Sequence, residues 1–327
     1  MNVHTDRGET ADGVIVIDHL VKDFGSVHAV DDLSFTVRPG RVTGFLGPNG
    51  AGKTTTLRIL LGLVAPTAGT ATIGGSTYPH VPQPMRAVGA ALEAASFHPG
   101  RSALDHLRVY APQVGVNDAR CREVLDFVGL GAVAGRRAGG FSLGMRQRLA
   151  LAATLLGDPP VLLLDEPANG LDPEGIAWLR LLLRHLAGEG RTVLVSSHVL
   201  SEVEQTVDDV VIIARGRLVH SSSLAELAAL AEPSVRVTSP DEAGLRRLIA
   251  AAGWADRVEP EVAGQPGVAV IHRVTAPEIG ARAFAAGLEL HELVPRDVGL
   301  EDIFLRLVGE DARSEDAAPH LPPGVAR

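Results

Sequence analysis

The stretch "GPNGAGKTT" at residues 47–55 has residue types and spacing that could do chemistry. It fits the pattern G-x-x-x-x-G-K-[ST], and it follows a short apolar run and opens a predicted helix. The glycines let backbone N–H groups close on phosphate oxygens, while Lys53 reaches the β/γ oxygens and Thr54 can hold Mg²⁺. The predicted phosphate-binding residues are Gly47, Pro48, Asn49, Gly50, Ala51, Gly52, Lys53, Thr54 and Thr55.

An acidic pair stands in a second stretch, "VLLLDEP". Asp165 and Glu166 come at the carboxyl end of a predicted buried strand, where ligands bind in open α/β sheets. We expect Asp165 to help position Mg²⁺ and Glu166 to polarise an attacking water. By itself the pair would fit an exposed acidic strand end better than a catalytic site. Beside a phosphate loop, it predicts transfer of a phosphoryl group to water.

A third stretch, "GGFSLGMRQRLALAA" at residues 139–153, is typical of a helix start. Ser142 suits the N-cap position, because its hydroxyl can accept from a free backbone N–H of the first turn. Helix starts also attract anions through their N–H groups and dipole. Nothing within these fifteen residues says which anion that would be.

Alternating strands and helices must position these residues. Apolar runs such as "VLLLDE", "TVLVSSH" and "DVVIIARG" alternate with helical stretches, which indicates an α/β fold with a largely parallel sheet. Beyond Ser221 the order is β-α-β-β-α-β, counting a weak strand near "DRVEP", and predicts a small α+β, ferredoxin-like unit. Its two helices are expected to begin with the capping boxes Ser239/Glu242 and Thr275/Glu278. We expect domains at 14–220 and 234–309, with flexible tails at 1–13 and 310–327.

Composition narrows the class of protein. The 327 residues include 30 Lys and Arg against 39 Asp and Glu, and the formal net charge of −9 argues against nucleic acid as the main partner. Cys121 is the single cysteine, which fits a reducing compartment. The polar start "MNVHTDRGETADG" is unlike a signal peptide, and no run approaches the roughly eighteen apolar residues of a membrane span.

Several motifs together resemble one family. "GPNGAGKTT", "FSLGMRQRLALAATLLGDPPVLLLDEPANGLDP" and "TVLVSSHVLSEVEQTVDDVVII" occur in the order and spacing of ATP-binding-cassette (ABC) transporter ATPases, over about residues 14–220. "SLGM" and the "LEA…FHP" pattern look like the ATPases of bacterial antibiotic and lantibiotic exporters, of the bacitracin and daunorubicin type. The resemblance implies a P-loop ATPase core with an antiparallel β subdomain and a helical subdomain, followed by an accessory domain.

The resemblance implies an answer for the helix start. In such ATPases two subunits lie head to tail around two ATP molecules, and each signature loop caps the nucleotide of the other subunit. Ser142 and Gly144 would then meet the ATP of the partner chain in a homodimer. The family pattern L-S-G-G-Q is not reproduced, because Phe141, Leu143 and Met145 replace its first, third and fifth residues.

Further roles come from the same resemblance. His198 is similar to the switch histidine that contacts the γ-phosphate, and Asp172 ends a loop that crosses the dimer. Phe24 matches the aromatic on which adenine stacks, although a buried core phenylalanine fits it nearly as well. Glu93 stands where many relatives carry a glutamine that senses Mg²⁺ and water. It equally fits a solvated carboxylate at a helix end.

The predicted function is therefore an ATP- and Mg²⁺-dependent subunit that energises export of a drug, antibiotic or peptide-like compound. Coupling to a separate membrane permease is expected through residues 93–110, which would hold the chain at the inner face of the cell membrane. Glu166, His198 and Lys53 are the predicted catalytic residues. The alternatives are a soluble ABC-type ATPase acting on ribosomes or DNA, and a docking subunit without ATPase activity.

Overall fold

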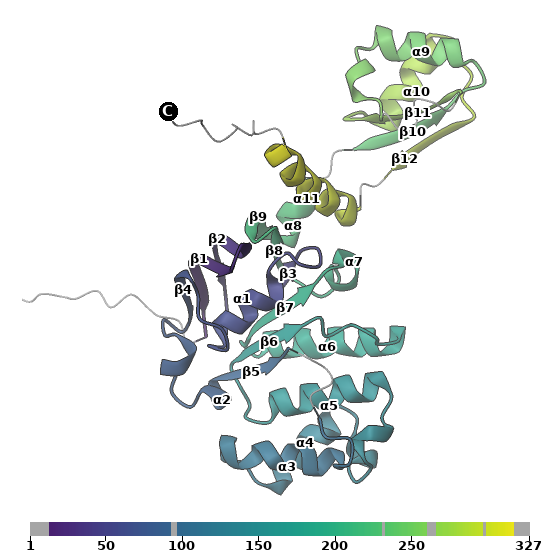
Figure 1. Ribbon diagram of the computed structural model, residues 1–327. Coiled ribbons are helices and arrows are strands. Elements are labelled where there is room, and N and C mark those ends of the chain that lie inside the picture. Colours follow the sequence, from purple (N-terminus) through teal and green to yellow (C-terminus); the bar gives the residue numbers. More distant parts are fainter. Residues whose placement is uncertain (1–12, 93–96, 231–232, 260–265, 297–298, 317–327) are drawn as a thin grey trace, which may run out of the picture. The chain divides into compact units, whose positions relative to one another are not determined.

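A six-stranded sheet forms the centre of one of two compact units in the computed structural model (Figure 1). The structure describes residues 13–92, 97–230, 233–259, 266–296 and 299–316. In sheet order the strands are β5 (Val88–Ala91), β6 (Val161–Asp165), β7 (Thr192–Ser197), β3 (Val42–Leu46), β8 (Asp209–Ala214) and β9 (Arg217–Ser223). Only the β8–β9 pair is antiparallel, so the prediction of a largely parallel sheet is confirmed.

The central strands are apolar because helices and a second sheet cover them. Every residue of β3 and of β7 is buried, as expected for strands of a covered parallel sheet. Two helices, α1 (Lys53–Leu60) and α6 (Pro173–Gly188), pack against the sheet. Because β6, β7 and β3 are neighbours, the motifs at their carboxyl ends come together at one edge.

An antiparallel sheet stands beside this core. Its strands, in sheet order, are β2 (Val27–Val37), β1 (Ile15–Phe24) and β4 (Ala68–Ile73). Helix α1 contacts this sheet as well as β6 (Figure 1). Ile15 of β1, Leu57 of α1 and Leu163 of β6 belong to one buried apolar cluster, so the two sheets share a core.

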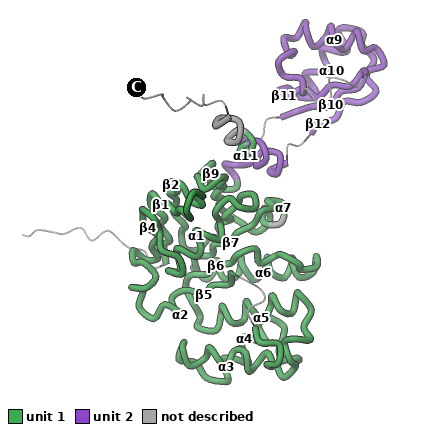
Figure 2. Tube along the Cα trace, in the orientation of Figure 1, with its two compact units in different colours: residues 1–224, 307–327 green, residues 225–306 purple. Residues whose placement is uncertain are grey.

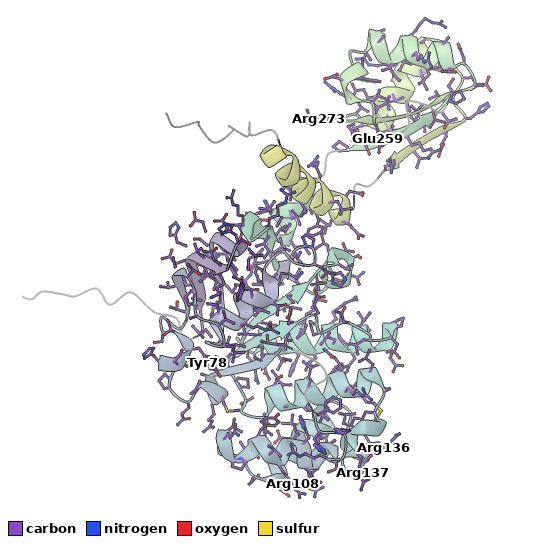
Figure 3. The ribbon with its side chains drawn as sticks, in the orientation of Figure 1. Tyr78, Arg108, Arg136, Arg137, Glu259 and Arg273 are labelled. Carbon is purple, nitrogen blue, oxygen red and sulfur yellow. The ribbon has the colours of Figure 1, made fainter. Side chains whose placement is uncertain are left out.

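A helical layer forms the other end of this unit. It contains α3 (Ala103–Val114), α4 (Asp118–Phe127) and α5 (Leu143–Leu155). Polar N-caps open all three: Ser102, Asn117 and Ser142 each accept a hydrogen bond from a backbone N–H three residues later. Arg108 fastens α3 to α4, with Nε 2.9 Å from Asp118 Oδ1 (Figure 3).

Strand β5 was not predicted. The sequence from residue 81 indicates a proline-broken stretch followed by helices, whereas the structure places α2 (Pro84–Ala87) and then β5 in it. After Val88 the strand consists of Gly89, Ala90 and Ala91, which have low β propensity, and the strand depends on its pairing with β6. Single-turn elements complete this unit: 3₁₀ turns at Tyr78–His80, Gly131–Val133 and Ala138–Gly140, and α7 (Leu200–Val203).

The other unit has a sheet and a core of its own. Its strands, in sheet order, are β11 (Val268–His272), β10 (Ser234–Thr238) and β12 (Glu292–Arg296), all antiparallel. Helices α9 (Glu242–Ala251) and α10 (Ala276–Ala285) supply apolar side chains to a cluster that includes Val237, Leu245 and Trp254. A small α+β unit was predicted here, and the structure has one, with an antiparallel sheet.

Three local predictions in this unit are wrong or incomplete. The weak strand near "DRVEP" amounts to a single bridge, from Val258 to Ile271, and the residues after Glu259 lie outside the described ones. Asp241, not Ser239, caps α9, because the Ser239 hydroxyl donates to the carbonyl of Glu289 at 2.7 Å. Thr275 is the N-cap of α10, but its side chain makes no capping bond.

The unit boundaries also differ from the expected ones. The chain divides into residues 1–224 with 307–327, and residues 225–306 (Figure 2). Strand β9 runs to Ser223 and α8 (Leu224–Ala229) follows, so the main fold continues past residue 220. Helix α11 (Leu300–Asp316) continues beyond residue 309, where a flexible tail was expected. Residues 1–12 and 317–327 of the expected tails lie outside the described ones.

No helix in the described part of the chain combines the length and the apolar character needed to cross a bilayer.

Candidate functional site

The phosphate loop joins β3 to α1 and encloses a cavity of about 210 Å³. Its glycines are required by the backbone: a Cβ on Gly47 would lie 2.3 Å from the carbonyl oxygen of Ile213. Gly52 has a φ of 103°, which only glycine adopts without strain. The residues that line the cavity are Ala29, Asn49, Gly50, Ala51, Gly52, Lys53, Thr54, Thr55 and Glu166.

Replacing Gly52 by alanine tests this backbone requirement. A Cβ there would lie 2.4 Å from the carbonyl oxygen of Ala29, whereas a Cβ on Gly50, whose φ is also positive, would meet nothing within 4 Å. We expect G52A to lower the free energy of unfolding by at least about 1 kcal/mol more than G50A. Denaturant unfolding without nucleotide measures the difference, and equal losses in the two variants would contradict the proposed backbone clash.

Lys53 lies almost buried in the loop, with 6% of its side chain exposed. Its Nζ donates to the carbonyl of Gly47 at 2.6 Å and to that of Pro48 at 3.2 Å. Glu166 Oε1 lies 3.6 Å from Lys53 Nζ, and its carboxylate supplies a negative charge opposite the ammonium. Burial lowers the pKa of Lys53, and the neighbouring carboxylates oppose that shift. The ammonium is therefore short of hydration and well placed to bind phosphate oxygens.

Thr54 and Asp165 meet at the same edge of the sheet. The Thr54 hydroxyl donates to Asp165 Oδ2 at 2.7 Å. A hydroxyl and a carboxylate are the oxygen ligands that Mg²⁺ prefers when substrate phosphates and water complete its shell. The described residues hold no group of three or more His, Cys, Asp or Glu suited to a metal, and a phosphate-bound Mg²⁺ needs none. These two side chains therefore fit the ion.

Glu166 and His198 form the other half of the site. His198 Nδ1 lies 2.8 Å from Glu166 Oε2, and because a carboxylate only accepts, that nitrogen carries the proton. Glu166 has a φ of 49°, a left-handed backbone conformation that is uncommon for a residue with a side chain. Its carboxylate faces both Lys53 and His198, so the phosphate loop and the two strand-end motifs converge on it.

Sequence reasoning missed Ser196. This serine lies in β7, its hydroxyl donates to Asp165 Oδ1, and it accepts from the backbone N–H of Glu166 at 3.0 Å. The only available signal was a polar residue in an otherwise apolar run, and such a residue is more often structural.

The N-terminus of α5, where the predicted signature loop lies, does not line the same cavity. Ser142 caps α5, as predicted, by accepting from the N–H of Met145 at 3.3 Å. Leu143 is 51% exposed and covers the loop after β6, so that a Cβ on Gly170 would lie 1.9 Å from Leu143 Cδ2. Neither Ser142 nor Gly144 is among the described residues around the cavity of this chain.

The remaining predicted residues have different settings. Asp172 is the N-cap of α6, with Oδ1 accepting from the N–H of Gly175 at 2.8 Å. Phe24, at the end of β1, is half exposed, with Lys22 Nζ 4.8 Å from its ring centroid. The exposed ring is available for stacking, and the alternative of a buried core residue is wrong. Glu93 lies outside the described residues.

The sequence matches two family models. Residues 30–169 match the ABC transporter family. Residues 233–301 match a family described only as a domain of unknown function, DUF8746.

Curated and solved proteins agree with the first match. The bacitracin transport ATP-binding protein BcrA of Bacillus licheniformis is 44% identical over 210 residues, which cover 63% of this chain and 69% of that protein. The Nod factor export ATP-binding protein I of Paraburkholderia xenovorans (strain LB400) is 35% identical over 309 residues, covering 92% and 98%. A solved ATP-binding subunit of an ABC transporter superposes with a TM-score of 0.61 at 27% identity, over 66% of this chain and 92% of the other.

Proposed function

Because the chain belongs to the ATP-binding subunits of ABC transporters, we propose that it works as a homodimer that hydrolyses Mg-ATP to drive export of an antibiotic or peptide-like compound through a separate permease. The observation that carries this proposal is that Glu166, which lines the cavity together with Lys53, contacts both Lys53 and His198. The resemblance to a bacitracin transport protein supports the substrate class.

In this proposal the residues that line the cavity and those beside it divide the work. Backbone N–H groups of the phosphate loop and the ammonium of Lys53 bind the phosphates, and Phe24 stacks on the adenine. Thr54 and Asp165 hold Mg²⁺, which supplies charge neutralisation at the transferred phosphoryl group. Glu166 orients and polarises the attacking water, and His198 fixes the Glu166 carboxylate through their hydrogen bond. Positioning and electrostatics account for most of the catalysis in such transfers.

The second subunit completes the cavity. The N-terminus of α5, with Ser142 and Gly144, presents free N–H groups that suit a γ-phosphate. Because these residues do not line the described cavity of their own chain, a nucleotide on another copy is the natural ligand. Leu143 limits how closely the backbone approaches, and the Asn169–Asp172 loop beneath it would cross to the partner.

A groove of about 560 Å³ supports coupling to a permease. It lies along β5, the edge strand of the sheet, between that strand and the helical layer, and Phe97, His106 and Tyr110 of the expected coupling segment at residues 93–110 line it. Apolar and aromatic residues dominate its walls: Leu61, Leu63, Tyr78, Met85, Phe97, Tyr110 and Val114. A docked permease would place the chain at the inner face of the membrane.

Export in cells tests the proposal. The chain is expressed together with a candidate permease, a polytopic membrane protein from the same genome, and growth is measured with bacitracin and with a lantibiotic. We expect resistance that is lost with K53A, and an ATP-hydrolysing membrane complex on purification. Co-purification with ribosomal RNA in place of a membrane protein would contradict the exporter assignment.

The C-terminal unit, which was expected at residues 234–309 and spans residues 225–306 in the structure, is proposed to be a ferredoxin-like accessory domain that follows the ATP-binding domain expected at 14–220. Its strand order, with the Val258 bridge beyond β11, supports that topology. We propose that it stabilises the dimer or regulates coupling.

Deleting residues 225–327 tests this role. The cavity and both sheets of the ATP-binding unit lie within residues 13–224, so we expect the Kd for ATP to stay within about threefold of the full chain. Dimerisation or export should weaken, as measured by sedimentation with ATP and by the resistance assay. Full export by the truncated chain would count against an accessory role.

A further inference from the structure

We propose that Ser196 is a positioning residue for ATP hydrolysis, which holds the metal-binding Asp165 and the water-orienting Glu166 in one fixed arrangement. The inference rests on the proposed function. Ser196 lies in β7, one strand away from the two acidic residues, and it does not line the nucleotide cavity.

The Ser196 hydroxyl connects two different groups. A serine hydroxyl has one proton to donate and lone pairs to accept with. Here the proton goes to Asp165 Oδ1, and the oxygen accepts from the backbone N–H of Glu166 at 3.0 Å. One buried atom therefore fixes the side chain of Asp165 and the backbone of Glu166 together.

The geometry at each end depends on this hydroxyl. Asp165 accepts from Ser196 on Oδ1 and from Thr54 on Oδ2, so both carboxylate oxygens have a fixed direction. Glu166 adopts a left-handed φ of 49°, which must be held by its surroundings. The hydrogen bond from its N–H to Ser196 supplies such a hold, and it leaves the carboxylate between Lys53 and His198.

The sheet makes the arrangement rigid. Asp165 and Ser196 are register partners in the parallel pairing of β6 with β7. Ser196 is 0% exposed, so bulk solvent does not compete for its hydrogen bonds with either partner. Mutation of residues that hydrogen-bond to metal ligands and orient them typically lowers metal affinity or activity about 10- to 100-fold.

Thr192 offers a matched control on the same strand. It is also 0% exposed, and its hydroxyl donates to the carbonyl of Gly13 at 2.7 Å, four residues before Ser196 and away from the acidic pair. S196A and T192V each delete one buried hydroxyl of β7. A general loss of strand stability would affect them alike, whereas a loss of positioning would affect S196A alone.

The experiment compares wild type, S196A and T192V in the full chain. For S196A we expect kcat to fall about 10- to 100-fold, with KM for ATP at saturating Mg²⁺ within about threefold. Titration calorimetry with a non-hydrolysable ATP analogue supplies a second readout. Its metal-free affinity should match wild type, while the gain in affinity on adding Mg²⁺ should be smaller in S196A and unchanged in T192V.

The outcomes separate this inference from the proposed function. If the wild-type chain does not hydrolyse ATP, either alone or with the permease, the proposed function is contradicted. If the wild type is active, three results would overturn the role of Ser196. These are a kcat of S196A within about twofold of wild type, an unchanged gain in nucleotide affinity on adding Mg²⁺, and equal losses in S196A and T192V.

Discussion

E166Q will bind ATP but turn it over about 10²- to 10⁴-fold more slowly than the wild-type chain. The amide has nearly the shape of the carboxylate, but it is a far weaker base and carries no charge with which to polarise water. Binding should survive, because Lys53 keeps its hydrogen bonds to the carbonyls of Gly47 and Pro48 and loses only a competing carboxylate at 3.6 Å.

Steady-state phosphate release and nucleotide titration measure the two effects. Glu174, exposed in the first turn of α6, provides the control, and E174Q should behave as wild type. Because ATP would persist in E166Q, we also expect a dimer in sedimentation with Mg-ATP, from two chains that each cap the other's nucleotide. Hydrolysis by E166Q at the wild-type rate would contradict the assignment of Glu166.

K53A will bind ATP roughly 30- to 3,000-fold more weakly, which corresponds to about 2–5 kcal/mol for removing one partner of a buried charge pair. The wild-type ammonium is 6% exposed and poorly hydrated, so binding phosphate costs it little further desolvation. Without it, the triphosphate would meet the Glu166 carboxylate with no neighbouring cation, and repulsion would add to the loss.

Titration of K53A with a fluorescent ATP analogue measures this change. R122A serves as the control. Arg122 is exposed on α4 and does not line the cavity, so this substitution also removes one positive charge but does so away from the site. Thermal unfolding without nucleotide checks that K53A is folded. A folded K53A with wild-type ATP affinity would refute the phosphate-binding role of Lys53.

The phosphate loop could be predicted because all the residues of its motif lie close together in the sequence. Glycines at 47, 50 and 52 set the backbone, and Lys53 and Thr54 follow directly. Asp165, Glu166 and His198 were predictable because parallel strands bring their carboxyl ends to one edge, and each of the three comes at or just after the end of an apolar strand.

Contacts between distant residues could not be predicted in the same way. Leu143 covers Gly170, Ser239 reaches Glu289, and β5 exists because it pairs with β6. Nothing in the local sequence around Ser239 distinguishes a helix cap from a side chain bound to a remote carbonyl. The capping box therefore failed where tertiary structure supplied a competing acceptor.

The sequence by itself determined the glycine-rich loop with Lys53 and Thr54 and the carboxylates that stand at the strand ends, since both follow from local spacing and from strand direction. Only the tertiary structure decided that Ser196 joins Asp165 to Glu166, and that Glu166 faces Lys53 and His198 together. The reason is register: neighbouring strands can slide past one another without any change in their own pattern. The packed sheet alone fixes which side chains meet across it.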